Sequence, residues 1–349
     1  MQIQSMKPTK TVFLLGAGLS HAVSKSMPLT KDLGKQIVKR YTGEFSARQK
    51  ADLIEDSTEK FEKLLTWLAL RKPWLSEADN LRERAVFLDL TNCVRVLFEE
   101  AVFNAVTDSL GEAPEWWLRL LSYWHYQHSP VITLNYDTLI EWTSSRFYTS
   151  SKENVVLATN QLYPIALTPA HAASGHSSES QSIESFQLYK LHGSINWFYS
   201  GQENFYGEPI FFTGCNDGLL GIWSEAQKQK EKIERRMLSG KVPLIIPPVL
   251  DKTFFFKHEI MQSLWFKAGN ALRKADKIVC IGYSLPKSDL TMAEFIKDAC
   301  AGRKIPFEII DLRDGMIPHF KSVLGDESFD FYQNFSGNEA VANFSCQLT

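Results

Sequence analysis

The chain has 349 residues, of which 44% are hydrophobic and 22% are charged, so it has ample apolar material for a large globular core. A formal net charge of −2 gives no general attraction to nucleic acids or acidic membranes. The five cysteines are odd in number and widely spaced, without a CxxC pair, which argues against a disulfide framework and a structural zinc site. We therefore expect a cytoplasmic protein with no metal, no bound nucleic acid and no membrane span.

Short β-rich segments alternate with helical patterns along the chain. Most of these segments are continuously apolar, as expected for parallel strands that are buried on both faces. This pattern predicts an α/β fold, a Rossmann-like doubly wound parallel sheet with a helical insertion. The predicted strands cover residues 11–15, 131–134, 188–191, 243–247, 277–282 and 307–311.

The stretch between the first two predicted strands is almost wholly helical. Apolar and aromatic side chains recur there at helical spacing in residues 61–71, 84–106 and 114–126, which is typical of core packing. We predict a helical insertion at about 42–126 and a smaller insertion at about 198–242. The Ser-rich segment 171–185 is expected to be a surface loop.

The first predicted strand runs into Gly16-Ala17-Gly18, and Ser20 lies in the helix that follows. Glycines at such a turn let backbone N–H groups approach a pyrophosphate at the positive end of a helix. His21 stands where the dinucleotide fingerprint GxGxxG has its third glycine, so a hydride-transferring dehydrogenase fits poorly. The alternative interpretation is a tight turn that binds no ligand.

Three further strands end in small or polar residues. Asn135 and Asp137 follow the strand at 131–134, and His192-Gly193 follows the strand at 188–191. Gly282-Tyr283-Ser284 ends the strand at 277–282. Because ligands of open α/β sheets bind at the carboxyl ends of the strands, these residues predict one shared crevice. The alternative for Asn135 and Asp137 is that they cap a helix starting near Thr138.

The motifs GAGxS, TxNYD, KLHGSxNW and IGYSLPxxD occur in this order between residues 11 and 311. Together they resemble the sirtuin-like domains of bacterial antiphage defence, which occur in Thoeris systems, beside short Argonautes and beside HerA helicases. The resemblance implies a single catalytic domain over 1–349. Two features depart from the related protein deacylases: the paired CxxC zinc ribbon is absent, and residues 26–35 replace an Asp-Phe-Arg run. Both departures argue against deacylation and leave NAD binding intact.

For such a family member the resemblance implies hydrolysis of NAD to nicotinamide and ADP-ribose, and hence NAD depletion in infected cells. Nicotinamide leaves as a neutral base, so the reaction needs no general acid. His192 would accept a proton from water or a ribose hydroxyl, since its ordinary pKa lies near neutral pH. Asn135 would hold the ribose hydroxyls or the attacking water, and Asp137 would orient Asn135 or contact the nicotinamide carboxamide.

The remaining site residues are assigned to dinucleotide binding. Gly193 would let the substrate approach the backbone. Asp311, at the end of the last predicted strand, is a candidate for an adenosine ribose hydroxyl, with a helix cap as the alternative. The predicted binding residues are Gly16, Ala17, Gly18, Ser20, Gly193, Gly282, Tyr283, Ser284 and Asp311.

Two other activities stay open. The first is a protein deacylase or ADP-ribosyltransferase on the same fold, and the second is a non-catalytic sensor of NAD or ADP-ribose. Because unregulated NAD hydrolysis would kill the host, we expect activity to be gated by homo-oligomerisation, by a defence-system partner protein, or by both. The helical region 42–126 or the loop 171–185 is expected to obstruct the nicotinamide pocket at rest.

Overall fold

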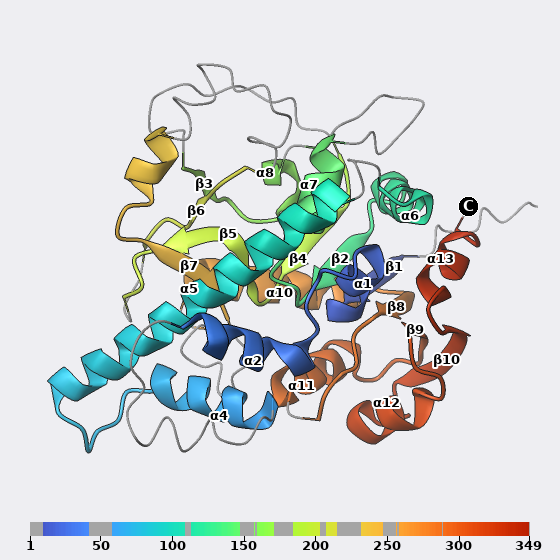
Figure 1. Cartoon of the computed structure of the whole chain (residues 1–349). Coiled ribbons are helices and arrows are strands. Elements are labelled where there is room, and N and C mark those ends of the chain that lie inside the picture. The colour runs from blue at the N-terminus through green and yellow to red at the C-terminus, as the bar shows by residue number, and fades with distance from the viewer. Residues whose placement is uncertain are drawn as a thin grey trace, which may run out of the picture.

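The computed structural model describes residues 10–41, 58–108, 113–146, 157, 159–170, 184–202, 207–214, 232–246, 256, 258–287 and 289–348. Its main sheet has six strands in the order β10-β9-β8-β1-β2-β4, and neighbouring strands all pair in parallel. The predicted doubly wound α/β fold is thereby confirmed (Figure 1). The strands are β1 (Thr11–Leu15), β2 (Pro130–Thr133), β4 (Gln187–Lys190), β8 (Lys277–Ile281), β9 (Ile305–Asp311) and β10 (Phe329–Ser336).

Helices cover both faces of the main sheet. Phe13 of β1 packs edge-to-face against Trp124 of α6 (Glu115–Tyr126), with ring centroids 5.5 Å apart. Phe307 of β9 points to the opposite face, because the register aligns it with Val12 through Ile278 and side chains alternate along a strand. There it contacts Phe320 of α12 (Ile317–Leu324), with ring centroids 5.5 Å apart. α11 (Leu290–Cys300) lies beside both α12 and α10 (Glu259–Arg273), and α13 (Ala340–Ser345) lies beside α6.

One predicted strand belongs to a different sheet. Residues 243–247 were expected in the parallel sheet, but β7 (Val242–Ile245) pairs antiparallel with β5 (Gly193–Tyr199). These two strands form a second sheet of order β3-β6-β5-β7, with β3 at Thr168–Pro169 and β6 at Phe211–Phe212. A continuous apolar segment indicates burial on both faces, but it does not indicate which neighbour supplies the hydrogen bonds.

The described residues between β1 and β2 are mainly helical. α1 (Ala17–Val23) and α2 (Thr30–Arg40) are followed by α4 (Thr58–Ala69), α5 (Glu77–Asp108) and α6. α5 has 32 residues and runs across the second sheet, where it contacts β5 and β7 (Figure 1). None of the described helices is long and apolar enough to cross a membrane. After β2 the chain forms α7 (Leu139–Arg146) and α8 (Thr159–Leu162).

Parts of the predicted insertions lie outside the described residues. They are 42–57 and 109–112 of the helical insertion, 203–206 and 215–231 of the smaller insertion, and 171–183 of the Ser-rich segment. The domain boundaries therefore stay predictions.

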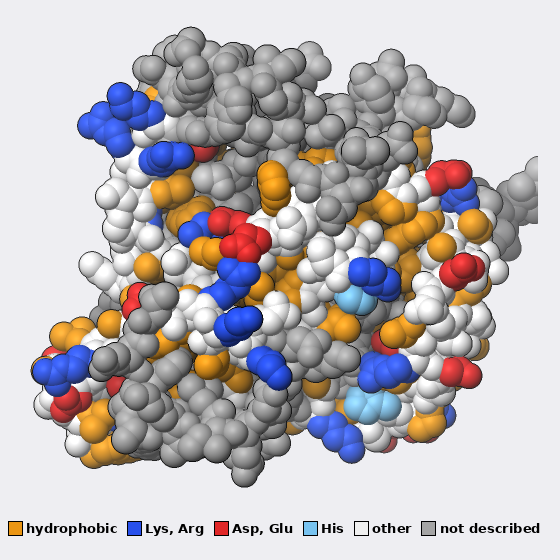
Figure 2. All heavy atoms as spheres, in the orientation of Figure 1, with side chains coloured by type: hydrophobic (Ala, Val, Ile, Leu, Met, Phe, Trp, Pro, Cys, Tyr) orange, Lys and Arg blue, Asp and Glu red, His pale blue; other side chains and the backbone are white. Residues whose placement is uncertain are grey.

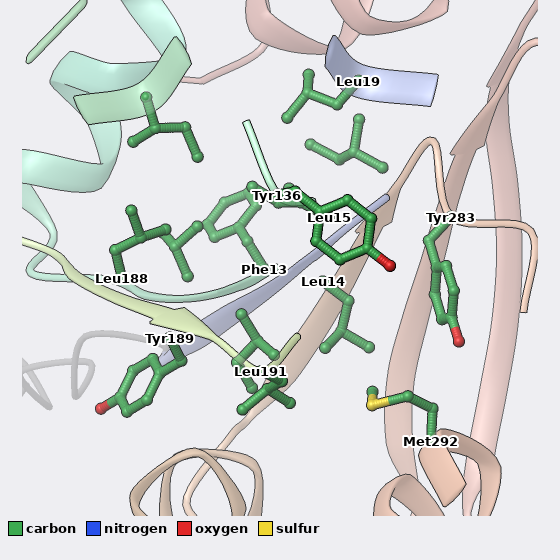
Figure 3. Close-up of a cluster of buried hydrophobic side chains, with 14 of the residues drawn as sticks. Phe13, Leu14, Leu15, Leu19, Tyr136, Leu188, Tyr189, Leu191, Tyr283 and Met292 are labelled. Carbon is green, nitrogen blue, oxygen red and sulfur yellow. The ribbon is translucent and has the colours of Figure 1, made fainter. Parts of the chain in front are cut away.

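The hydrophobic core extends to the carboxyl ends of the strands. Figure 3 shows Leu15 of β1 and Leu191, just after β4, in one cluster with Tyr136 and Tyr283, which follow β2 and β8. Leu15 is 1% exposed, Leu191 0%, Tyr136 6% and Tyr283 8%. The segments that carry the candidate site residues are thus anchored in close-packed core, and their backbones are held in place.

Candidate functional site

The topology of the main sheet reverses between β1 and β8. From β1 the chain adds β2 and then β4 on one side, and it returns to add β8 and β9 on the other side. In open α/β sheets the ligand crevice lies outside the carboxyl ends of the strands at such a reversal. The Gly16–Gly18 turn and the Gly282–Ser284 segment follow the two strands that flank this point.

Close packing between the two glycine segments accounts for three of the glycines. A Cβ at Gly16 would lie 2.6 Å from Tyr283 Cα, and a Cβ at Gly18 would lie 2.8 Å from Gly282 Cα. Gly282 has φ +61°, and a Cβ there would lie 2.3 Å from the backbone nitrogen of Leu19. The N–H groups of Gly16 and Gly18 donate to Ile281 O and Gly282 O, at 3.1 and 2.9 Å. Pyrophosphate binding by Gly16, Ala17 and Gly18 stays a prediction.

Ser20, Asn135 and Asp137 form one hydrogen-bonded network across the ends of β1 and β2. Asn135 Nδ2 donates to Gly16 O and to Ser20 Oγ, both at 2.9 Å, and Ser20 Oγ donates to Asp137 Oδ2 at 2.6 Å. Asp137 Oδ1 accepts from Leu139 N at 3.1 Å in the first turn of α7, so Asp137 also has the capping role considered as its alternative. Burial raises the pKa of the Asp137 carboxyl, and Lys190 and the bond from Ser20 oppose that rise.

A fully buried ion pair adjoins this network. Lys190, the last residue of β4, donates from Nζ to Glu141 Oε1 at 2.8 Å and also to the backbone oxygen of Asp137. Tyr163 Oη donates to the same Glu141 oxygen at 2.8 Å. A cavity of about 10 Å³, the size of one water molecule, is lined by residues that include Ser20, Asn135, Asp137, Glu141 and Lys190.

His192 lies in the turn between β4 and β5, next to the Asn135–Asp137 segment. Its ring stacks on Tyr136 with a centroid distance of 6.5 Å and an interplanar angle of 29°. Its backbone oxygen accepts from Ile246 N at 2.9 Å, and the residue is 7% exposed. Gly193 has φ +75°, and a Cβ there would lie 2.1 Å from Leu244 O of β7. Contact between β5 and β7 therefore accounts for this glycine, and substrate approach at Gly193 stays a prediction.

The segment after β8 is held by bonds of its own. Tyr283 Oη donates to Asp289 Oδ2 at 3.0 Å, and Asp289 caps α11. His319 Nε2 donates to the backbone oxygens of Ser284 and Leu285, each at 2.9 Å. None of these three bonds involves the hydroxyl group of Ser284.

Asp311 lies at the end of β9 and is 7% exposed. It accepts from Arg313 N at 2.9 Å and from Arg313 Nε at 3.0 Å. These bonds close a local turn rather than cap a helix, because α12 begins only at Ile317 with Met316 as its N-cap. The capping interpretation is therefore wrong, and a contact with an adenosine ribose stays a prediction.

Sequence reasoning missed the charged pair that supports the network. Lys190 stands in a strand of otherwise apolar character, "LYKL", and a buried lysine requires a partner. That signal was available, but Glu141 and Tyr163 could be identified as the partners only from the structure. Arg313, the partner of Asp311, and Thr133, whose Oγ1 accepts from Asn135 N at 3.1 Å, carried no comparable signal.

No family model matches the chain, and no curated protein matches its sequence. Among solved structures the chain is similar to Sir2Tm bound to a propionylated peptide, at a TM-score of 0.36 and 12% identity, over 97% of this chain and 91% of that one. The fold class rests on the sheet order and the two helical layers described above.

Proposed function

We propose that the chain is an NAD+ hydrolase that cleaves the nicotinamide–ribose bond, giving nicotinamide and ADP-ribose, and that it serves as an NAD-depleting effector of antiphage defence. The observation that supports this proposal is the contact between His192 and the Asn135–Asp137 segment at the carboxyl edge of the sheet. A base, an amide and a carboxylate thereby lie at the carboxyl ends of β2 and β4, on one side of the point where the topology reverses.

In this proposal the bonds of the network assign each polar group a role. Both donors of Asn135 are already used on Gly16 and Ser20, so its Oδ1 would accept from a ribose hydroxyl or from the attacking water. Asp137 would orient Asn135 through Ser20, because its carboxylate is buried and bonded to the Ser20 hydroxyl. His192 would take the proton from the nucleophile. The charge that develops on the ribose in the oxocarbenium-like transition state would be stabilised by these fixed groups.

The dinucleotide would lie across the topological reversal. We assign the pyrophosphate to the first turn of α1, with Gly16, Ala17, Gly18 and Ser20, and the nicotinamide ribose to the region of His192 and Gly193. The adenosine half would contact Gly282, Tyr283, Ser284 and Asp311. A ligand-bound structure in which the adenine lies far from residues 282–284 and from Asp311 would contradict this assignment.

The decisive experiment is mass spectrometry of NAD+ incubated with the purified chain. We expect nicotinamide and ADP-ribose in equal amounts, and at least about 10²-fold slower product formation by the His192→Ala variant. Consumption of an added acyl-lysine peptide would instead show a deacylase, and ADP-ribose attached to protein would show a transferase. Binding of NAD+ without any product, in the presence of the gating partner, would show a sensor.

The long helix α5 contacts the candidate site, which supports the proposal that the helical region gates activity. Phe98 of α5 packs edge-to-face on Tyr136, with ring centroids 5.5 Å apart, and Tyr136 in turn stacks on His192. A shift of α5 would therefore move the ring against which His192 lies.

Apolar side chains on the same helical region offer a surface for such a shift. Trp74 is 67% exposed and Leu81 62%, and Figure 2 shows apolar side chains at the end of the molecule where α5 begins. We propose that a second copy or a defence-system partner binds here. Size-exclusion chromatography with light scattering, run beside the NAD+ assay, tests this, and a strict monomer with full activity would contradict gating.

A further inference from the structure

The buried ion pair between Lys190 and Glu141 connects three elements around the candidate site. Lys190 ends β4 and is 0% exposed, and Glu141 lies in the first turn of α7 and is 1% exposed. Besides its bond to Glu141, the Lys190 ammonium donates to the backbone oxygen of Asp137. The pair therefore ties the end of β4, two residues before His192, to the segment that carries Asn135 and Asp137.

Stability alone is a weak reason for a pair of this kind. Taking two charges out of water costs several kcal/mol per ion, and the attraction within the pair often does no more than offset that cost. Replacing a buried ion pair by apolar residues of similar volume is often neutral or stabilising. What an apolar pair does not supply is a charged donor to the backbone oxygen of Asp137.

A cavity next to the ion pair makes the bond from Lys190 to the Asp137 carbonyl important for the position of the backbone. The cavity of about 10 Å³ is lined by Glu141, Ser20 and Asn135 among others, and Glu141 Oε2 has no hydrogen-bond partner in the described part of the chain. Without the ammonium, the turn at Asp137 has both an unsatisfied carbonyl and room into which to relax. A relaxation of the backbone there would move the Asp137 carboxylate away from the Ser20 hydroxyl and would release Asn135.

We propose that Lys190 and Glu141 are positioning residues of the NAD+ site: the pair fixes the backbone of Asp137, so that Ser20 and Asn135 are held in their reactive arrangement. This inference rests on the proposed function, since it concerns the same site. Neither residue touches the substrate. Their effect reaches it through the Asp137 backbone and the Ser20–Asn135 bond.

The test separates positioning from stability with two variants. Lys190→Met leaves the Glu141 carboxylate buried and unpaired, so we expect a strongly destabilised protein. The double variant K190M/E141Q removes both charges and keeps an acceptor for Tyr163, so we expect it to regain most of the stability that Lys190→Met loses, less the cost of the unsatisfied Asp137 carbonyl. Its kcat for NAD+ cleavage should nevertheless remain at least about 10-fold lower, with KM changed little, because the reacting groups are misplaced.

Lys277→Met is a control for the loss of an ion pair of the same sheet outside the site. Lys277 forms an ion pair with Glu308 at 2.5 Å in the same sheet, but it stands at the amino end of β8, away from the candidate site. We expect wild-type kcat from this variant. Wild-type kcat in the stable double variant would overturn the positioning inference, because a merely structural pair requires only that stability be restored.

The exchange rate of backbone amide hydrogens tests the positioning inference independently of enzymatic activity. The N–H of Leu139 donates to Asp137 Oδ1, so it should exchange faster in the double variant than in the wild type and in the control. If the wild type cleaves no NAD+ even with its partner, the proposed function fails, and the exchange rate still decides the positioning. Unchanged protection of Leu139 in the double variant would contradict the inference whatever the activity.

Discussion

Gly193→Ala distinguishes the two explanations of the glycine that follows His192. The sequence suggested that Gly193 lets the substrate approach the backbone, whereas the structure places Leu244 O of β7 where a side chain would begin. If the contact with β7 is the reason for glycine, the substitution should lower stability. If substrate approach is the reason, the substitution should lower the affinity for NAD+ and should cost little more than the backbone strain.

The expected loss of stability has two parts. An L-residue at φ +75° costs about 1–2 kcal/mol in the left-handed region. A Cβ would also lie 2.1 Å from Leu244 O, so β5 and β7 must separate by about 1 Å. Forcing extra volume into a close-packed region costs about 1–3 kcal/mol. Together they give about 2–5 kcal/mol, a large fraction of the roughly 5–15 kcal/mol by which a protein is stable.

Gly240→Ala is the matched control, because Gly240 has φ +73° and a Cβ there would have no atom within 4 Å. It should cost only the strain of about 1–2 kcal/mol. For 349 residues the unfolding entropy is about 0.7 kcal/mol/K, so we expect Tm to fall by about 3–7 °C in Gly193→Ala and by about 1–3 °C in the control. Equal stability of the two variants, measured by calorimetry or chemical denaturation, would refute the packing explanation.

Three further predictions concern the polar groups of the site. His192→Ala should lose NAD+ cleavage by at least about 10²-fold and keep its circular dichroism spectrum, and an active variant would place the base elsewhere. Asn135→Ala should abolish turnover, should still bind NAD+ in calorimetry, and should unfold about 1–3 kcal/mol more easily, since two hydrogen bonds are lost; absence of binding would assign Asn135 to affinity or folding. Because the folded-state pKa of Asp137 is raised, the wild type should lose stability relative to Asp137→Asn as pH rises from about 4 through that pKa, and a pH-independent difference in unfolding free energy would contradict the raised pKa.

The sequence predicted most of the main sheet because its strands have a strong local signature. β1, β2, β4, β8 and β9 are short, mostly apolar and separated by helical segments, and this pattern indicates strands that are buried on both faces. β10 was missed because its side chains alternate between half-buried and exposed positions. β7 was predicted as a strand and placed in the wrong sheet, since apolar character does not choose a pairing partner.

The sequence determined which residues end the strands, and parallel strands bring their carboxyl ends to one edge of a sheet. The sequence therefore places Gly16, Asn135, His192 and Gly282 at the same edge of the sheet. Only the tertiary structure decided what those residues contact. It showed that Gly18 and Gly282 touch each other, that Ser20 joins Asn135 to Asp137, and that a buried Lys190 supports the Asp137 backbone. Such contacts join residues that are far apart in the chain, and they depend on distances of a few tenths of an ångström, which no local pattern of residue types encodes.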